Sequence, residues 1–553
     1  MFIVRIPDSR RPHYPPQVLL MESYREAGAA RSKVKHRTLA NLTHHAPEEV
    51  AALEFALKHK HELPRLEASL GAEVKQGRSV GAVWLLREAA ERVGLVKALG
   101  SSREGKLSLW LILARLIDQG SRLSAARLAE AHAACEALGL GGFDEDDLYS
   151  AMDWLEPRQG RIEQGLFRSR QASSPPELYL YDVTSSYLEG ECNAYGAYGY
   201  NRDGKRGKKQ IVVGLLLDGE GAPVSVEVFA GNTQDVLTVE SQVRKLADRF
   251  GAKGVTLVGD RGMLKSAQLE ELSAEGFHYL TAITKPQIET MLKSGALQLG
   301  MFDEKLCEVS VEGVRYLLRK NPQRAAELEA SREDKFRCVQ ARAARRNAYL
   351  AEHPRAKTET GQRDLLAYGK RLRIDGWARV RIEGRVLVVE RDDEARARVS
   401  RLDGCYALKT DVPLAAASAE TLHARYKDLT EVERAFRVMK TVHLEVRPVF
   451  VQKASRTRAH VFIVMLALLL RRELEHAWRH LDLTVEEGIN ALASLCAHEV
   501  VLSNHAGYLT VPQPRADLQP LFSALKTSPP AHLPRRLESV VTKAKLPARR
   551  KKA

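Results

Sequence analysis

Two aspartates stand in segments where aspartate is unfavourable. Asp182 interrupts the apolar strand pattern LYLYDVT, which continues beyond it through Val183 and Thr184. Asp260 ends the apolar run VTLVGD and is followed by Arg261. Aspartate is depleted in strands and is seldom fully buried without a partner. Because GDRG is also a turn signal, a turn explains Asp260 as well as a site does, whereas no turn explains Asp182.

A third carboxylate, Glu433, borders the apolar face of a predicted helix. In the segment YKDLTEVERAFRVMKT, apolar residues recur at intervals of three and four, which indicates one buried face formed by Leu429, Val432, Phe436 and Met439. Tyr426 and Lys440 lie seven residues before and after Glu433. Seven steps of about 100° drift by only about 20°, so on a continuous helix these three side chains form one line.

The helix alone also permits two structural explanations of Glu433. It precedes Arg437 by four residues, which is the favoured order for an ion pair on a helix surface. It follows Thr430 by three residues, as the acid of a capping box does when a helix starts at such a threonine. Taken alone, this segment favours these explanations over a chemical role.

Carboxylates from two strands and a later helix are together what a divalent-metal site needs. Mg²⁺ prefers hard oxygen ligands and keeps several waters, so a few carboxylates and a substrate phosphate complete its shell. Two such ions can activate the attacking oxygen and stabilise the leaving oxygen in phosphoryl transfer. The combination of Asp182, Asp260 and Glu433 therefore predicts an enzyme that acts on phosphodiesters.

The charge of the chain favours a polyanionic partner. The 553 residues have a formal net charge of +15 and a pI near 9.4. Nucleic acid is the commonest such partner, although charge does not separate DNA from RNA or from an acidic membrane surface. Six cysteines without a CxxC pair or a His cluster argue against a zinc site and a disulfide framework, and they favour a reducing cytosol. The start lacks a signal peptide and no apolar run can span a bilayer, so we expect a cytoplasmic protein with no membrane partner.

Periodicity divides the chain into six predicted segments. They are an N-terminal hairpin and helix region (1–78), a helical region that could bind DNA ends (79–172), the first part of a sheet-containing core (173–290), an insertion (291–410), a second core part with the Glu433 helix (411–505) and a basic C-terminal tail (506–553). From Arg535 onward we expect the tail to be a flexible basic arm.

The two aspartates fall in a run of alternating strands and helices. LYLYDVTSSYLE, KKQIVVGLLLD, APVSVEVFAGN and VTLVGDRG predict strands, as does FHYLTAIT. DVLTVESQVRKLADRF and SAQLEELSAEG predict helices. The order of three strands, a helix, a strand, a helix and a strand predicts a mixed α/β sheet.

Elsewhere the pattern is mainly helical. LMESYREAGAARSKVKHRTLANL predicts a hairpin, and helices are predicted for PEEVAALEFALKHKHEL, WLLREAAERVGLVKAL, LSLWLILARLIDQG, AARLAEAHAACEALGL and QRAAELEASREDKFRCVQARAARRNAYLAEH. RLRIDGWARVRIEGRVLVVERD and CYALKTD predict short strands, and VFIVMLALLL (461–470) predicts a buried helix. Trp377 fits a core position better than a base-stacking one.

These stretches resemble the DDE transposases of bacterial insertion sequences, specifically the insertion-sequence-four superfamily. The resemblance rests on YDVTSSYLEGE, GYNRDGKRGKKQIVVGLLLDGEGAPVSVEVFAGNTQD, VGDRGML, YKDLTEVERAFRVMK and RPVFVQKASRTRAHVFIVMLALLLRRELE, in this order over 178–478. It implies that Asp182, Asp260 and Glu433 are the catalytic acids and metal ligands. We therefore expect an α/β fold: a ribonuclease H-like mixed-sheet catalytic core with an α-helical N-terminal region and an α+β insertion between Asp260 and Glu433.

The resemblance also implies residues that contact DNA. The helix motif of the superfamily is Tyr, two residues, Arg, three residues, Glu, six residues and Lys, and Leu429 stands here at the Arg position. The expected DNA-binding residues fall into three groups. The Tyr and Lys of this motif are Tyr426 and Lys440, and the arginines that could replace the missing one are Arg434 and Arg437. The cations near the first two acids are Arg261, Lys208 and Lys209. The loop NRDGKRGKKQ, which holds the last two, is explained equally well as a solvated hairpin tip.

The implied activity is transposition. Two Mg²⁺ ions, with Mn²⁺ as a substitute, would activate a water that cuts DNA at the element's ends. The released 3′-hydroxyl would then attack a target phosphodiester. The implied partners are double-stranded DNA, as terminal inverted repeats and target, and a second copy of the chain in a synaptic complex, on the nucleoid of a bacterial cytoplasm. Two alternatives stay open: a catalytically silent DNA-binding protein derived from a transposase, and a metal-dependent nuclease without strand transfer.

Overall fold

The structure of the chain is a computed structural model. It describes residues 1–7, 16–25, 34–58, 73–170, 178–250, 255–261, 263–264, 276–441, 444–447, 449–501 and 507–534. Contacts group the chain into two units: Met1–Leu85, Arg127–Phe143 and Glu487–Val541 form the first, and Leu86–Ala126, Asp144–Glu486 and Thr542–Ala553 form the second. This grouping joins segments that lie far apart in the chain, and the six-segment division of the sequence remains a prediction. The predicted basic arm from Arg535 lies outside the described residues.

The first unit contains two small antiparallel sheets. One has the order β1-β2-β3, with β1 (Phe2–Ile6), β2 (Gln17–Arg25) and β3 (Val34–Asn41), and is followed by α1 (Pro47–Lys58). The other has the order β17-β16-β15-β4, with β4 (Glu73–Ser79), β15 (Cys496–Val501), β16 (Gly507–Thr510) and β17 (His532–Leu533). Pairing of β2 with β3 confirms the predicted hairpin, and α1 confirms the helix predicted after it.

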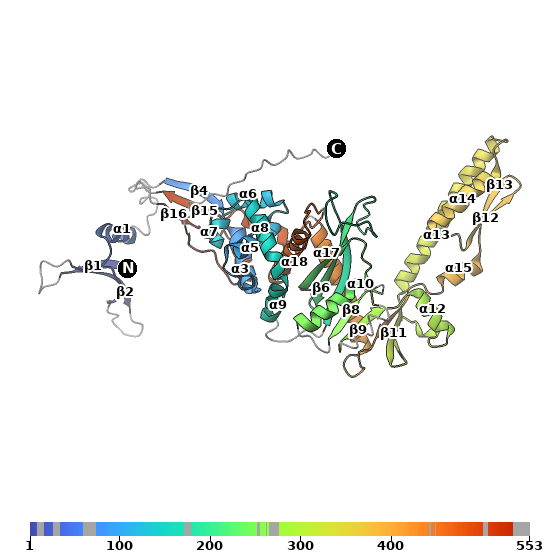
Figure 1. Ribbon diagram of the computed structural model, residues 1–553, viewed down its shortest axis with the longest axis horizontal. Helices are drawn as coiled ribbons and strands as arrows, with labels where there is room; N and C mark the ends of the chain where they lie inside the picture. The colour runs from blue at the N-terminus through green and yellow to red at the C-terminus, as the bar shows by residue number, and fades with distance from the viewer. Residues whose placement is uncertain are drawn as a thin grey trace. The chain divides into compact units, whose positions relative to one another are not determined.

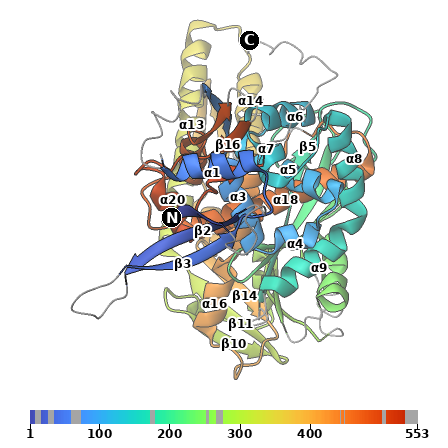
Figure 2. The same ribbon diagram turned by 90° about the vertical axis from the view of Figure 1, so that its left-hand side faces the viewer.

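Helices dominate residues 81–170 and recur after residue 454. They are α3 (Gly81–Arg92), α4 (Leu95–Leu99), α5 (Arg103–Ile117), α6 (Arg122–Ala131), α7 (Ala134–Leu138), α8 (Glu145–Leu155), η1 (Glu156–Arg158), α9 (Gln159–Arg170), α18 (Ala454–Ala477), α19 (Val485–Leu492) and α20 (Gln519–Ala524). Helices α5, α8 and α18 pack on one another (Figure 2). All ten residues of VFIVMLALLL are buried within α18, as predicted.

Two predicted helices of this region are each broken in two. The first is interrupted at Gly94, whose φ of 79° is open to glycine but ends an α-helix. The second is interrupted after Ala131, because the Ala133 N–H donates to the Ser79 carbonyl rather than to the preceding helical turn. In both cases the apolar spacing persists across the break, so the sequence pattern alone merges the two helices.

The second unit is built on an eight-stranded sheet with the order β10-β11-β14-β9-β8-β5-β6-β7 (Figure 1). Its strands are β5 (Leu178–Tyr187), β6 (Gln210–Asp218), β7 (Pro223–Ala230), β8 (Thr256–Gly259), β9 (His278–Ala282), β10 (Cys307–Val311), β11 (Val314–Lys320) and β14 (Cys405–Thr410). β8 is parallel to β5 and to β9, and the other neighbours are antiparallel. This mixed sheet confirms the expected α/β core.

Of the helices that follow the strands of the sheet, the one predicted from DVLTVESQVRKLADRF is confirmed, whereas the helix at Lys285–Lys293 was not predicted. α10 (Val236–Arg244) continues into the π-helical turn η2 (Lys245–Arg249), whereas the helix predicted from SAQLEELSAEG lies almost wholly outside the described residues. α12 (Lys285–Lys293) and η3 (Leu299–Met301) follow β9. Helices α16 (Ala419–Lys427) and α17 (Leu429–Lys440) come after β14.

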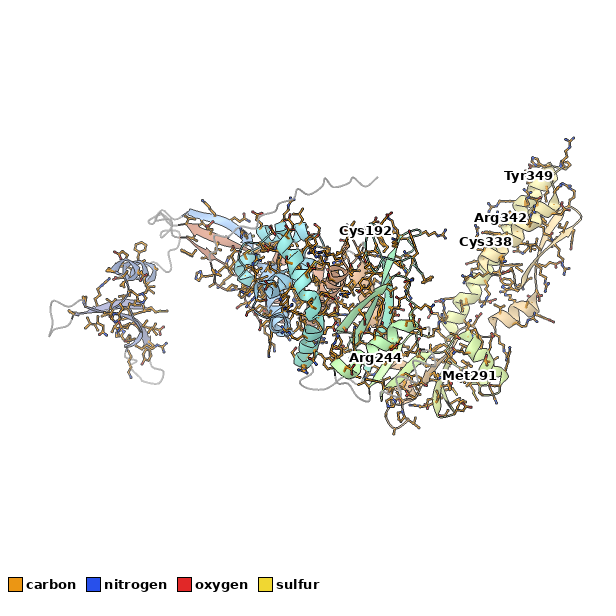
Figure 3. The ribbon with its side chains drawn as sticks, viewed as in Figure 1. Cys192, Arg244, Met291, Cys338, Arg342 and Tyr349 are labelled. Atoms are coloured by element: carbon orange, nitrogen blue, oxygen red, sulfur yellow. The ribbon has the colours of Figure 1, made fainter. Side chains whose placement is uncertain are left out.

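Residues 321–404 form an arm between β11 and β14. It consists of α13 (Pro322–Glu352), α14 (Thr358–Leu372), β12 (Ala378–Glu383), β13 (Val386–Arg391) and α15 (Asp393–Ser400). Figure 3 shows Cys338, Arg342 and Tyr349 spaced along α13. Trp377 is 2% exposed in a core that the arm builds from its own residues, which confirms its predicted core position. The prediction missed α14 and took its last two residues for a strand, because TETGQRDLLAYGKRL has few apolar residues and two glycines.

The arm leaves and re-enters the sheet at one place. Lys320, the last residue of β11, is paired with Cys405, the first of β14. Beyond this pair, the Asn321 N–H donates to the Gly404 carbonyl at 2.8 Å. The arm is thus an insertion whose two ends are already joined by hydrogen bonds.

Candidate functional site

Asp182 and Asp260 are held on neighbouring parallel strands. Tyr181 of β5 is paired with Gly259 of β8, so each aspartate directly follows one member of that pair. Side chains alternate between the faces of a strand. Tyr179, Tyr181 and Val183 point into the core cluster that contains Val239 of α10, so Asp182 points to the opposite face.

The surroundings of Asp182 favour its neutral form. Burial raises the pKa of Asp182 to about 7, and the carboxylates of Asp260 and Asp235 add to the rise. The Val183 N–H, which donates to Oδ1 at 2.8 Å, and the Arg202 charge oppose it. In the described part of the chain, neither Asp182 nor Asp260 is in an ion pair. Two neighbouring carboxylates that are in no ion pair are a donor set that fits a divalent cation.

Asp260 is exposed and is oriented by two donors. The Arg261 N–H donates to Asp260 Oδ1 at 2.7 Å. The Tyr426 hydroxyl donates to the same oxygen at 3.5 Å, which is long for such a bond. Burial and the Asp260 charge raise the pKa of Tyr426 above its usual value, so the phenol keeps its proton. The structure thus brings Asp182, Asp260 and Tyr426 together.

Tyr426 and Glu433 lie on two successive helices, α16 and α17, so the alignment of Tyr426, Glu433 and Lys440 along one continuous helix is not found. α16 ends at Lys427 and α17 begins at Leu429. Asp428 lies between them, and its N–H is shared between the carbonyls of Ala424 and Arg425. The Glu431 N–H then reaches back only three residues, to the Asp428 carbonyl. This tightened turn forms the junction between the two helices.

α17 is fixed by its apolar face, as predicted. Val432, Phe436 and Met439 are buried and the helix packs against β5, whereas Leu429 is half-buried. Glu433 follows Val432 and is exposed. Because none of the buried residues of α17 belongs to the cluster around α10, α17 covers the face of β5 to which Asp182 points.

Neither structural explanation of Glu433 is found. Glu433 makes no hydrogen bond or ion pair with Arg437 or with any other described residue. The Thr430 hydroxyl donates to the Lys427 carbonyl at 2.8 Å instead of capping α17. Among the residues that the structure describes, no three His, Cys, Asp or Glu side chains form a group that could hold a metal. Two of the three predicted acids are therefore together, and Glu433 stands apart from them.

Some of the predicted DNA-binding cations are exposed, and others already contact a group of the protein. Arg261 and Arg437 are exposed. Arg434 is paired with Glu475 at 3.7 Å, Lys208 with Glu189 at 2.8 Å, and the Lys209 ammonium donates to the Glu191 carbonyl at 3.4 Å. Lys440 is paired at 2.9 Å with Asp203, and both side chains are nearly buried. Burial lowers the pKa of Lys440, and Asp203 partly offsets that change.

Sequence reasoning missed two acids near the site. Asp235 is paired with Arg202 at 2.6 Å, and both line a cavity of about 370 Å³ that also contacts Tyr200, Asn232 and Gln234. Asp203 anchors the loop that carries Arg202. For Asp203, the only signal in the sequence was that it is a single acid within the basic run NRDGKRGKK.

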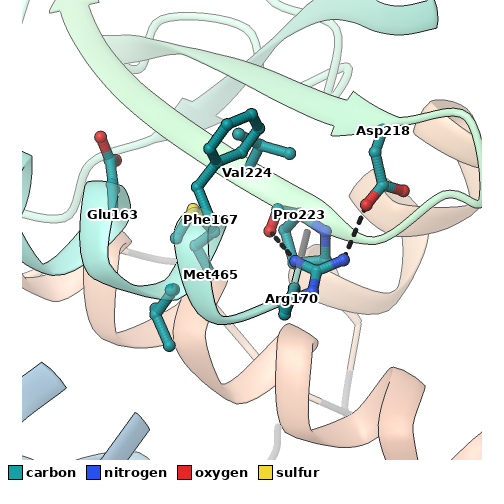
Figure 4. A pocket seen from close by; sticks show the side chains of 8 residues that line it. Glu163, Phe167, Arg170, Asp218, Pro223, Val224 and Met465 are labelled. Carbon is teal, nitrogen blue, oxygen red and sulfur yellow. Dashed lines mark hydrogen bonds and ion pairs between the residues drawn. The ribbon is translucent and has the colours of Figure 1, made fainter. Parts of the chain in front are cut away.

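A second cavity is lined by neither Asp182 nor Asp260. It is lined by Glu163, Phe167, Arg170, Asp218, Val224 and Met465, among others, and Figure 4 shows the Arg170–Asp218 ion pair in its wall. Its volume of about 10 Å³ is that of about one water molecule. The ion pair, at 2.7 Å, joins α9 to the end of β6, and we assign this cavity no chemical role.

Two family models match separate parts of the chain. The family model described as "Transposase DDE domain" matches residues 173–470, which is more than half of the chain. The model "IS1634 family transposase, N-terminal domain" matches residues 9–69. The first match contains Asp182, Asp260 and Glu433. No curated protein matches the chain significantly.

Two of the similar solved structures are transposase complexes. The "piggyBac transposase synaptic complex with hairpin DNA" has 8% identity and a TM-score of 0.37, covering 74% of this chain and 75% of that one. The "Mos1 transposase paired-end complex with left transposon end" has 11% identity and a TM-score of 0.15, covering 32% and 58%. At these scores the assignment rests on the family models. Among the described residues, no helix has the length and apolar character needed to cross a membrane.

Proposed function

The chain belongs to the DDE transposases, enzymes that cleave DNA and transfer the cut strand, and from this premise we propose that Asp182, Asp260 and Glu433 are its catalytic acids. Divalent-metal dependence comes with the family, and we propose two Mg²⁺ ions, with Mn²⁺ as a substitute. When bound, the ions would supply the positive charge that activates the attacking oxygen and offsets the charge of the leaving oxygen. The observation that carries the proposal is the Asp182–Asp260 pair on adjacent parallel strands.

The two aspartates have different roles in this proposal. Asp182 is the half-buried member, and because its pKa is raised to about 7, a bound cation would favour its ionised form. Asp260 is the exposed member that reaches the DNA side, held by the Arg261 N–H and the Tyr426 hydroxyl. Glu433 is the third acid. It is exposed next to the buried anchor Val432, on a helix that packs against the Asp182 strand.

The proposed partners are the element's terminal inverted repeats, a target DNA and a second copy of the chain in a synaptic complex. Arg261 and Arg437 are exposed cations that fit contacts to phosphate. Arg434, Lys208 and Lys209 would exchange their present partners for phosphate oxygens. Tyr426 and Lys440 stay predictions of the same kind, although both already contact an aspartate.

The proposal is tested by separating binding from cleavage. Glu433→Gln, Asp182→Asn and Asp260→Asn are each expected to bind end DNA while losing cleavage by at least about a thousandfold, because each removes one oxygen ligand of the metal site. Cleavage and strand joining would be followed on labelled end DNA with Mg²⁺. Glu420→Gln, an exposed acid at the start of α16, is the matched control and should leave both rates unchanged. Cleavage by Glu433→Gln at the wild-type rate would remove Glu433 from the acid set.

A further inference from the structure

Asp203 is a buried carboxylate inside an exposed basic loop. Its side chain is 1% exposed. It accepts hydrogen bonds from the Lys440 ammonium at 2.9 Å, from the Arg447 guanidinium and from the Tyr187 N–H at 3.2 Å. These donors come from the end of α17, from the segment after it and from the end of β5. A single carboxylate therefore joins three separate parts of the second unit.

The basic loop, residues 201–209, is ordered around this carboxylate. Asn201 Oδ1 accepts from the Asp203 N–H at 2.9 Å, and Asn201 Nδ2 donates to the Lys205 carbonyl at 3.0 Å. The Arg202 N–H donates at 2.8 Å to Ser185 Oγ, three residues along β5 from Asp182. Arg202, which lies next to the acid pair, directly precedes Asp203 in this loop.

We propose that Asp203 is a positioning residue of the transposase site, which pairs with Lys440 and Arg447 so that the basic loop is held against β5 and the end of α17. The part of this inference that concerns cleavage rests on the proposed function. The assignment also gives Lys440 a different role, in which its ammonium pairs with Asp203 and acts on DNA through the loop.

Burial distinguishes this ion pair from the others in the loop. Lys440 and Asp203 are 10% and 1% exposed, whereas Lys208 and Glu189, which pair at the other end of the loop, are 44% and 37% exposed. An exposed pair contributes little, because solvent screens both charges. A buried pair that loses one partner leaves an uncompensated charge in the interior. Loss of Asp203 should therefore release the loop, and loss of Glu189 should not.

The first test needs neither DNA nor metal. Limited trypsin digestion of the full chain would follow cleavage after Lys205 and Arg206 in the wild type, Asp203→Asn and the matched control Glu189→Gln. We expect Asp203→Asn to raise the loop cleavage rate by about tenfold and Glu189→Gln to leave it unchanged. Cleavage after Arg161, exposed on α9 in the second unit, reports unfolding outside the loop and should not change. Equal loop cleavage in all three proteins would overturn the inference and leave the proposed function intact.

The second test uses the sign of the charge change. Asp203→Asn makes the loop more positive, so simple attraction to phosphate predicts tighter DNA binding and unchanged or faster cleavage. Positioning instead predicts cleavage slower by about tenfold, with end binding that is not weaker, because small displacements at a reacting centre are costly. Faster or unchanged cleavage would overturn the inference.

A double mutant separates positioning from direct phosphate contact by Lys440. If Lys440 acts through Asp203, Asp203→Asn combined with Lys440→Met should cleave no more slowly than the worse single variant. If Lys440 binds phosphate on its own, the two losses should multiply. Lys440→Arg, which keeps the pairing charge, should retain loop protection. Multiplied losses, or loss of loop protection only in Asp203→Asn, would overturn the shared role.

Discussion

At Asp182 the fold keeps a carboxylate where its neutral form is favoured. The ordinary pKa of 3.8 applies in the unfolded chain, and burial with two nearby carboxylates raises the pKa to about 7 in the fold. Between these values the native state binds more protons than the unfolded state, so this group makes the free energy of unfolding fall as pH rises from about 4 to about 7. A bound cation would stabilise the ionised carboxylate and so remove this loss of stability.

Asp182→Asn is therefore expected to stabilise the metal-free protein above pH 7. The gain is at most about 4 kcal/mol, the equivalent of a shift of about 3 pH units, and it should shrink towards zero near pH 4. Urea unfolding at pH 5 and pH 8, with chelator present, measures it. Glu420→Gln provides the reference for an exposed acid. A stability difference that is the same at both pH values would contradict the burial of this charge.

The Tyr426 hydroxyl offers a second prediction for a single residue. Tyr426→Phe keeps the half-buried ring and removes only the donor to Asp260. We expect cleavage to slow by roughly three- to tenfold, with an unchanged melting temperature, because one long hydrogen bond to a carboxylate is lost. Cleavage rates over a Mg²⁺ titration would show the loss as a shift to higher Mg²⁺ concentration. A hundredfold loss that Mg²⁺ does not relieve would point to direct contact between Tyr426 and DNA.

At the scale of elements, α17 carries a residue expected to stabilise the fold and a residue proposed for catalysis within one turn of each other. Phe436 is 6% exposed and Glu433 is exposed on the same helix. Phe436→Ala should lower the free energy of unfolding by about 3–5 kcal/mol, because it empties part of the interface with β5. Glu433→Gln should change stability by less than about 0.5 kcal/mol while cleavage is lost. Thermal unfolding of both variants beside the cleavage assay tests the pair, and a strongly destabilised Glu433→Gln would contradict it.

The sequence predicts elements better than it predicts their partners. Apolar spacing identifies the buried face of α17, and the same spacing continues across Asp428, where the structure separates α16 from α17. The strands β5 to β9 are predicted from composition, whereas the extension of their sheet by β14, β11 and β10 depends on pairing between distant segments. Asp203 shows the same limit at the site, because its partner Lys440 is 237 residues away.

At the scale of the whole molecule, the arm is expected to fold as an independent piece. All members of its core lie within residues 321–404, and its two ends are hydrogen-bonded to each other. Expressed alone, residues 321–404 should be helical and should unfold cooperatively on heating, because they bring their own buried core. Circular dichroism measures both. Trp377→Ala should abolish the cooperative transition, and a wild-type fragment without a transition would show that the arm depends on the sheet.

Because the arm lies between Asp260 and Glu433 in the chain, the proposed acids are synthesised at different times. Asp182 and Asp260 leave the ribosome first, and Glu433 follows Asp260 by 173 residues, most of them in the arm and the strands at its base. At about 5–20 residues per second, the nascent chain carries two of the three proposed acids for on the order of ten to thirty seconds. A chain ended early in this interval, by a premature stop codon, would keep both aspartates and the basic loop but lack Glu433. Such a product would also lack Lys440 and Arg447, the partners of Asp203, so by the proposal above it would neither hold the basic loop in place nor cut DNA.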